Sequence, residues 1–149
     1  MPDLTTLLSR FLADLYASNA VGLAGIVARG RTVGATGAVS SVAAFTVGAT
    51  DASFEVVANV RPTTATTHAF TVTCAYTDEG NTARTLTMTF GLVAGGVTTT
   101  SIANATGTVP YMGVPVSIRC KAATTITIAT TGTFTTVVYN VEACITKTA

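Results

Sequence analysis

The sequence predicts an all-β fold: a single antiparallel β-sandwich or jelly roll over residues 39–149, preceded by an N-terminal α-helix and an extended arm over residues 1–38. From residue 39 onward, apolar and polar residues alternate with the period of two that is typical of strands. Threonine, which suits the pleated surface of a sheet, is abundant in these runs, and turn-forming residues separate them. The length of 149 residues suits one domain with one hydrophobic core.

The N-terminal residues are predicted to form an amphipathic helix. Their apolar side chains follow the alternating four-three spacing of a coiled-coil seam, which consists of Leu4, Leu8, Phe11 and Leu15. A lone helix of about four turns is only marginally stable in water. Its apolar face therefore needs a partner, and three alternatives remain open: the sandwich itself, symmetry-related copies, or another protein.

Residues 18–38 are rich in glycine and alanine and show no clear period, which is typical of an extended arm or linker. Their apolar content suits an arm that lies along a surface. The apolar members are Val21, Leu23, Ile26 and Val27. We expect the helix seam and this arm to serve oligomerisation or anchoring to a larger particle.

About eight strands are expected in the remainder, in the pattern of a sandwich or jelly roll. A first strand closes at residue 47, and the others are expected near residues 54–61, 70–76, 85–92, 97–103, 114–121, 124–130 and 135–145. The segment 85–92 shows the clearest alternation. Residues 78–82 are predicted to form a hairpin turn because Gly80 and Asn81 tolerate a positive φ.

The composition argues against several classes of protein. Charged residues make up 10% of the chain, against about 25% in typical domains, and the net charge is +1. The basic residues are scattered, and only Arg29 with Arg31, or Arg119 with Lys121, fall close together. We therefore expect no nucleic-acid partner, whose binding needs clustered basic residues. No apolar run has the length of about 20 residues that a membrane span requires, so no membrane partner is expected either.

A mean hydropathy of +0.55 is high for a protein with so little charge. Two explanations fit. Either much of the surface consists of threonine, serine and small apolar groups, or much of it is covered by other chains. The second explanation is favoured, because a net charge near zero gives little protection against association.

No catalytic constellation is visible in the sequence. A hydrolase needs a nucleophile, a base and an orienting group. The only histidine, His68, could act as a base, but a lone histidine beside threonines is far more often a surface residue or one with satisfied hydrogen bonds. Asp78 and Glu79 are adjacent on the predicted turn, so their side chains diverge into water. The phosphate-binding, nucleophile-elbow and dinucleotide motifs are absent. The sequence therefore predicts a protein that is not an enzyme, with no catalytic residues, no cofactor and no metal.

The three cysteines have no metal-ligand spacing and are expected to remain reduced thiols. Cys74 and Cys120 fall on the apolar side of their strands and are expected to be buried. Cys144 falls on the polar side, where it is either exposed or covered by a neighbouring subunit. Arg119 and Lys121 lie on the polar face of one strand and Glu142 on the polar face of the last one, so these charges could pair, across strands or across a subunit interface.

The segments YTDEGNTARTLTMTF (76–90) and PYMGVPVSIRCKAATTITIATTGTFTTVVYNVEACI (110–145) resemble small virion proteins of tailed bacteriophages. The resemblance covers about the C-terminal two-thirds of the chain and lies in the threonine-rich strands, the Asp-Glu-Gly-Asn turn and the closing Tyr-Asn-Val-Glu strand. Such families include head-decoration or cement proteins and head or tail fibres. They typically form trimers of β-sandwich or jelly-roll domains that an N-terminal helix or arm anchors to the particle.

The resemblance implies a non-enzymatic structural protein of the virion, assembled in the host cytoplasm. Its implied partners are further copies of itself, as a homotrimer, and the major capsid protein or another virion protein. As a decoration or cement protein it would bind the assembled shell and stabilise it.

The alternative is a tail-fibre or tail-tip module that recognises host surface glycans through Tyr111, Asn81 and His68. An enzyme and a bacterial surface adhesin are the weaker alternatives. An enzyme would need convergent polar groups, and an adhesin would need an export signal that we do not expect here.

Overall fold

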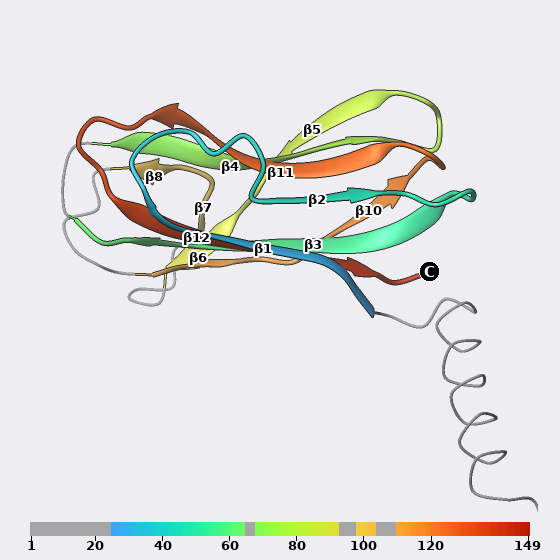
Figure 1. Ribbon diagram of the computed structural model, residues 1–149, viewed down its shortest axis with the longest axis horizontal. Coiled ribbons are helices and arrows are strands. Elements are labelled where there is room, and N and C mark those ends of the chain that lie inside the picture. Colours follow the sequence, from blue (N-terminus) through green and yellow to red (C-terminus); the bar gives the residue numbers. More distant parts are fainter. Residues whose placement is uncertain (1–24, 65–67, 93–97, 104–109) are drawn as a thin grey trace, which may run out of the picture.

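The computed structural model describes residues 25–64, 68–92, 98–103 and 110–149 (Figure 1). In these ranges all regular secondary structure is β-strand, so the predicted all-β class is confirmed. The helix predicted at the N-terminus lies outside the described residues.

Twelve strands form within the described ranges. They are β1 (Gly25–Ala35), β2 (Ala43–Thr46), β3 (Ala52–Pro62), β4 (Ala69–Thr77), β5 (Ala83–Thr87), β6 (Phe90–Leu92), β7 (Thr98–Thr99), β8 (Ile102–Ala103), β9 (Tyr111–Gly113), β10 (Val116–Cys120), β11 (Thr125–Thr133) and β12 (Tyr139–Lys147).

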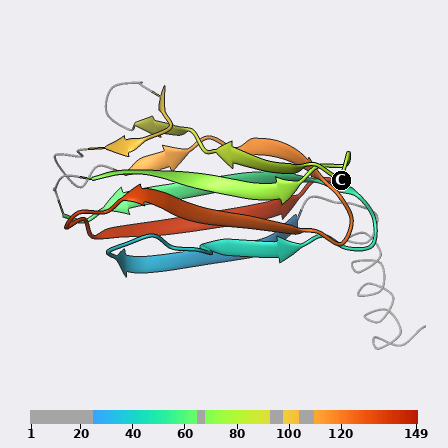
Figure 2. The same ribbon diagram turned by 90° about the horizontal axis from the view of Figure 1, so that it is seen from above.

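These strands form two antiparallel sheets that lie face to face, as the two views in Figures 1 and 2 show. In the described residues the larger sheet has the order β1-β12-β3-β9-β6-β7, and β10 also pairs with β3. The smaller sheet has the order β2-β11-β4-β5, and β8 also pairs with β4. The apolar faces of both sheets meet in one core, as expected for a two-layer fold.

Alternation along the strands builds this core. In β3 and β12, every second residue is buried, and the intervening residues are half-buried or exposed. The largest fully buried side chains include Tyr139, Phe54, Phe70, Phe90, Met88, Ile102, Ile126, Ile128 and Ile145. The hydroxyl of Tyr139 donates to the carbonyl oxygen of Gly37 at 2.7 Å and lies 2.8 Å from the Thr130 hydroxyl, so this buried phenol is hydrogen-bonded.

The predicted strand over residues 85–92 is divided between the two sheets. β5 belongs to the smaller sheet and β6 to the larger one. At the crossing, the Met88 N–H donates to the Val72 oxygen in the smaller sheet, whereas the Thr89 oxygen accepts from the Val114 N–H beside the larger sheet. Met88 and Phe90 are both buried, so the alternation continues through the crossing and does not reveal it.

The described part of the predicted arm starts with a strand. β1 forms the edge of the larger sheet and pairs antiparallel with β12. Its ladder is irregular between Ile26 and Ala28 and again between Thr32 and Ala35. Such bulges disturb the period of two, which is why this segment shows no clear period in the sequence. The predicted division at residue 38 therefore separates β1 from the sheet with which it pairs.

β1 comes very close to the segment that leads into β2. A Cβ atom at Gly30 would overlap the backbone carbonyl of Val42, so only glycine fits without a shift of the backbone. We expect Gly30→Ala to lower the free energy of unfolding by about 2 kcal/mol, the usual cost of overpacking a close contact. Urea denaturation measures this loss. The matched control is Gly48→Ala, where a Cβ atom would meet nothing within 4 Å. Equal stability of the two variants would contradict the close approach of β1.

Candidate binding face on the larger sheet

The outer face of β1, β12 and β3 carries a group of polar side chains. Directly opposed residues of neighbouring strands share a face. Glu142 of β12 is opposite Arg31 on one side and Asn59 on the other, which makes one row across three strands. Asn140 and Arg61 are opposite each other in the next row along the same face. The sheet register thus brings together residues from three distant parts of the sequence.

The only carboxylate in these rows is already paired. The Nε of Arg29 donates to Oε1 of Glu142 at 2.8 Å, and an Nη2 contact reaches the same oxygen. This hydrogen bond, and then the charge of Glu142, raises the pKa of Arg29 above its usual value. Within the described residues Arg31 and Arg61 form no ion pair, so both guanidinium groups in these two rows remain available to a ligand.

The two asparagine side chains are oriented by backbone donors. The Gly34 N–H donates to Oδ1 of Asn140, and the Gly113 N–H donates to Oδ1 of Asn59, both at 2.9 Å. Gly34 has a φ of 68° and lies in the bulge of β1, where the strand departs from its ladder with β12. Because each amide oxygen is occupied by an N–H group, each amide nitrogen remains as a donor.

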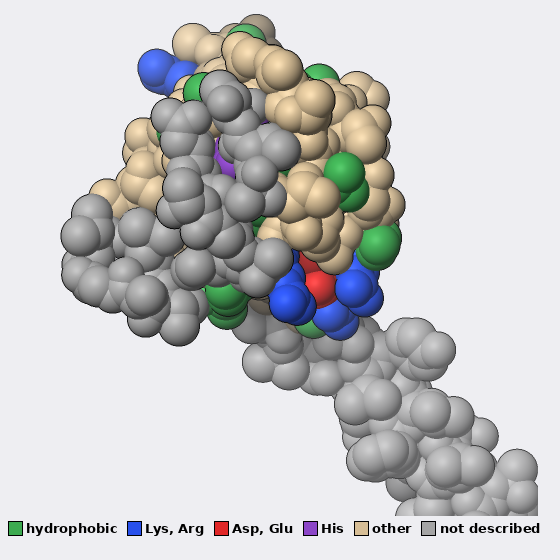
Figure 3. Space-filling model, turned by 90° about the vertical axis from the view of Figure 1, so that its left-hand side faces the viewer, with side chains coloured by type: hydrophobic (Ala, Val, Ile, Leu, Met, Phe, Trp, Pro, Cys, Tyr) green, Lys and Arg blue, Asp and Glu red, His purple; other side chains and the backbone are tan. Residues whose placement is uncertain are grey.

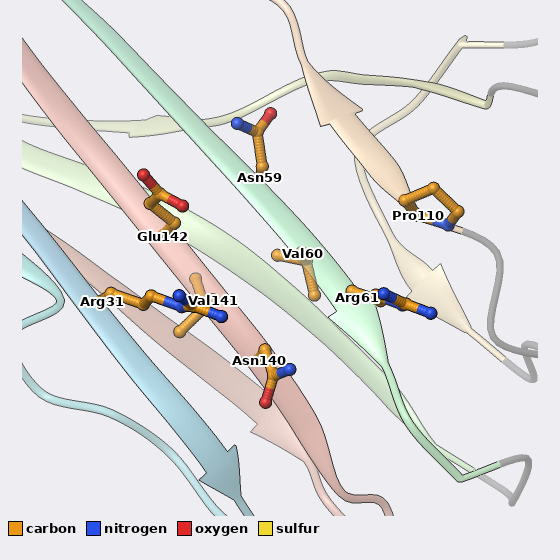
Figure 4. Close-up of a pocket in the computed structure, with 8 residues that line it drawn as sticks. All are labelled: Arg31, Asn59, Val60, Arg61, Pro110, Asn140, Val141 and Glu142. Carbon is orange, nitrogen blue, oxygen red and sulfur yellow. The ribbon is translucent and has the colours of Figure 1, made fainter.

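These side chains surround a shallow pocket of about 190 Å³, shown in Figure 4. Its lining consists of Arg31, Asn59, Val60, Arg61, Pro110, Asn140, Val141 and Glu142. In Figure 4 the Arg31 side chain extends over β12, and the Arg61 side chain extends toward Pro110. In Figure 3, which views one end of the molecule, basic side chains gather around an acidic one on the described surface. The pocket is suited to a ligand that offers acceptor oxygens.

Large apolar side chains are exposed on or beside the same sheet. Ile26 and Val33 of β1 are 65% and 64% exposed, and Met112 and Val114 are 48% and 41% exposed. Tyr111 of β9 is buried, so its neighbour Met112 faces outward. Exposed apolar groups at the edge of a sheet are a common sign of contact with another chain.

Most of the predicted anchoring residues lie outside the described ranges: Leu4, Leu8, Phe11, Leu15, Val21 and Leu23. The structure places the other two on β1. Ile26 is exposed, whereas Val27 is half-buried and packs against the core. Of these two, Ile26 is the more accessible for contact with another molecule.

The residues expected to bind a glycan do not share an exposed site. His68 and Tyr111 are buried, at 1% and 6% exposure, and the His68 ring packs near Phe70 with centroids 5.8 Å apart. Asn81 is exposed in the turn between β4 and β5. Neither buried ring is accessible for stacking on a sugar, so this choice of residues is wrong.

Among the described residues, Glu142 forms an ion pair with neither Arg119 nor Lys121. Glu142 pairs with Arg29 on β1, and Arg119 pairs with Glu79 in the β4–β5 turn at 2.5 Å. The basic residues looked scattered in the sequence, yet the sheet brings Arg29, Arg31 and Arg61 to one face. Because Arg61 alternates with buried neighbours on β3, the sequence pattern could have placed it on the outer face. The pairing of β12 with both β1 and β3 could not have been predicted in this way, because no pattern within one segment of the sequence indicates which strands pair.

The described part of the chain lacks two features, a cluster of metal-ligating side chains and a membrane-spanning helix. It contains no group of three or more histidine, cysteine, aspartate or glutamate side chains that could hold a metal ion. A helix of sufficient length and apolarity to cross a membrane is likewise absent from these ranges.

Comparison with known proteins shows only remote structural likenesses. No protein-family model and no curated protein matches the chain. The SPBc2 prophage-derived protein YomS is similar with 12% identity and a TM-score of 0.36, over 83% of this chain and 95% of that one.

A second similar structure contains the CBM22-1 and GH10 modules of the endo-1,4-β-D-xylanase 10B of Clostridium thermocellum. It has 16% identity and a TM-score of 0.30, and the likeness covers 74% of this chain but 20% of that one. A structure of infectious bursal disease virus has 11% identity and a TM-score of 0.24, over 84% of this chain and 40% of that one. Likenesses this weak do not indicate a function for the chain.

The three cysteines are free and differ in accessibility. Burial raises the pKa of Cys74 to about 12 and that of Cys120 to about 11, so both thiols stay protonated and inaccessible at neutral pH. Cys144 is half-buried on the outer face, opposite Arg29. We expect iodoacetamide to modify Cys144 alone in the folded protein and all three cysteines after unfolding, as measured by intact mass. Cys144→Ser should abolish labelling of the folded form, and rapid labelling of Cys74 or Cys120 there would contradict the packing.

Proposed function

We propose that the chain is a non-enzymatic structural protein of a tailed-bacteriophage virion. It binds the assembled shell as a homo-oligomer, most simply a homotrimer, in the manner of a head-decoration, cement or head-fibre protein. Its partners are then copies of itself and the major capsid protein or another virion protein. Support comes from the resemblance of residues 76–90 and 110–145, from the low charge of the chain and from the exposed apolar side chains of β1.

The observation that carries this proposal is the edge strand β1. It has a ladder on one side only, with β12, and it exposes Ile26 and Val33 by about two-thirds of their surface. In the sequence, residues 18–24 of the predicted arm connect β1 to the segment that is predicted to form an amphipathic helix. An edge that presents apolar groups is normally covered by another chain. Subunit contact along β1 would hide these side chains.

The described pocket favours binding over catalysis. Its lining holds no histidine, cysteine or hydroxyl side chain, and its one carboxylate, Glu142, is paired with Arg29. A general base or a nucleophile would need a different arrangement. A decoration protein needs no such groups. It stabilises a shell by binding only the assembled form, and many weak contacts add up through avidity.

A receptor-binding module of a tail fibre or tail tip is the second candidate function. The pocket between Arg31 and Arg61 favours it, because exposed donors on a sheet face can bind a host glycan. This candidate keeps the proposed virion location but changes the partner from a capsid protein to a host surface.

The first prediction from this function concerns oligomeric mass. Light scattering after size-exclusion chromatography should give three times the chain mass of 15.1 kDa. The double variant Ile26→Lys with Val33→Lys should shift the protein to the monomer, because two charges would be placed in the contact. The control carries the same charges on an exposed face of β5, as Thr85→Lys with Thr87→Lys. A monomeric parent protein, or equal dissociation of the control, would contradict contact along β1.

The second prediction concerns attachment to the particle. Removal of residues 1–24 leaves β1 in place, so the sheets should retain their cooperative unfolding while binding to capsids of the encoding phage is lost. Cosedimentation of the truncated and full-length chains with purified capsids measures this. Full binding by the truncated chain would remove the N-terminal segment from the anchoring mechanism.

A further inference from the structure

The pocket on the outer face of β1, β12 and β3 is unusually rich in hydrogen-bond donors. Arg31 and Arg61 are exposed and have no ion-pair partner among the described residues. The amide nitrogens of Asn59 and Asn140 add two donors, because the oxygens of both amides accept backbone N–H groups. Such a lining matches a ligand that carries negative charge and several acceptor oxygens.

The spacing of these donors indicates a ligand larger than a single carboxylate. Arg31 and Arg61 lie on strands separated by β12, and two strand spacings amount to about 10 Å. They also belong to neighbouring rows of the sheet. A ligand that contacts both therefore presents acceptor groups at two places that are about 10 Å apart.

Glu142, the one carboxylate in the described lining of the pocket, restricts the class of ligand that can bind there. Both contacts from Arg29 reach Oε1 of Glu142, which leaves Oε2 to accept a hydrogen bond from a ligand hydroxyl. The same carboxylate repels a densely charged phosphate chain, and the described lining contains no aromatic ring on which a base could stack. A nucleic acid is therefore a poor match.

A peptide is also a poor match. The backbone groups of β12 and β3, which carry most of the pocket lining, are engaged in ladders on both sides, and the free edge of β1 is on the side away from β12. The pocket itself therefore offers no strand edge for a peptide backbone. Recognition here depends on side chains alone. The pocket offers the groups that bind an acidic sugar. Its guanidinium groups can pair with the sugar carboxylate, its amide nitrogens can donate to ring and hydroxyl oxygens, and its one carboxylate can accept from a sugar hydroxyl.

We propose that this pocket binds a carboxylated saccharide, whose carboxylate pairs with Arg31 or Arg61 and whose hydroxyls contact Asn59, Asn140 and Glu142. The ligand class follows from the donor-rich lining. The inference goes beyond attachment to a shell and deepens the second candidate function, because it names the class of glycan. Its argument does not use the apolar contact at Ile26 and Val33, although Arg31 lies between these two residues on β1.

Titration of the full-length protein by calorimetry tests the proposal. The probes form two pairs that each differ by an acidic group or residue: methyl β-glucuronide with methyl β-glucoside, and 3′-sialyllactose with lactose. We expect at least one acidic probe to bind, and its neutral counterpart to bind at least about tenfold more weakly, since a charged hydrogen-bonded pair is lost. Absence of binding by both acidic probes, or equal binding within a pair, would overturn the proposal.

Variants locate the site. Arg31→Gln and Arg61→Gln should each weaken binding of the acidic probe by about tenfold, without a change in the unfolding transition, because both side chains are exposed. The matched control is Arg119→Gln, which loses the same charge from the same sheet. Arg119 is opposite Ser53, about 26 Å along β3 from Arg61 at about 3.3 Å per residue.

Two further results would also overturn the proposal. Equal weakening by Arg119→Gln would indicate general charge attraction in place of a site. Binding of succinate or of a glutamate-rich peptide as tightly as the acidic sugar would show that the pocket recognises carboxylates without the saccharide.

Discussion

Strand β12 and its register with two neighbours constrain the rest of the molecule. β12 pairs with β1 on one side and with β3 on the other, and its alternate residues divide between the core and the outer face. Tyr139 and Val141 fill the core, whereas Asn140 and Glu142 face outward. A slip of one residue would exchange these sets and expose the core. Burial of the apolar residues of β12 therefore determines its register, and this register determines which polar side chains lie next to each other on the outer face.

The outer face of the larger sheet combines two kinds of surface. The edge strand β1 exposes apolar side chains, and the neighbouring strands present guanidinium and amide groups around a shallow pocket. The bulge at Gly34 connects the two, because it ends the regular ladder of β1 and turns an N–H group toward Asn140. Bulges often re-aim side chains beside functional sites. Subunit contact and ligand binding would thus use adjacent parts of one face.

Much of the fold could be predicted from the sequence because its signals are local. Alternation predicted the long strands and the burial of Cys74 and Cys120. Alternation did not predict β1, because bulges disturb its period of two. It also did not predict the crossing between the two sheets at Met88, because the pattern continues there without a break. The pocket could not be predicted, because it depends on the pairing of a C-terminal strand with two strands far away in sequence. The burial of His68 likewise depends on tertiary packing.

The register of β12 is the central claim, and interstrand nuclear Overhauser effects measure it most directly. The structure predicts backbone contacts that link Glu142 with Asn59 on one side and with Arg31 on the other. Contacts of Glu142 with Ala58 and Gly30 instead would show a register shifted by one residue. That result, or the absence of any contact between β1 and β12, would contradict both the core and the binding face described above.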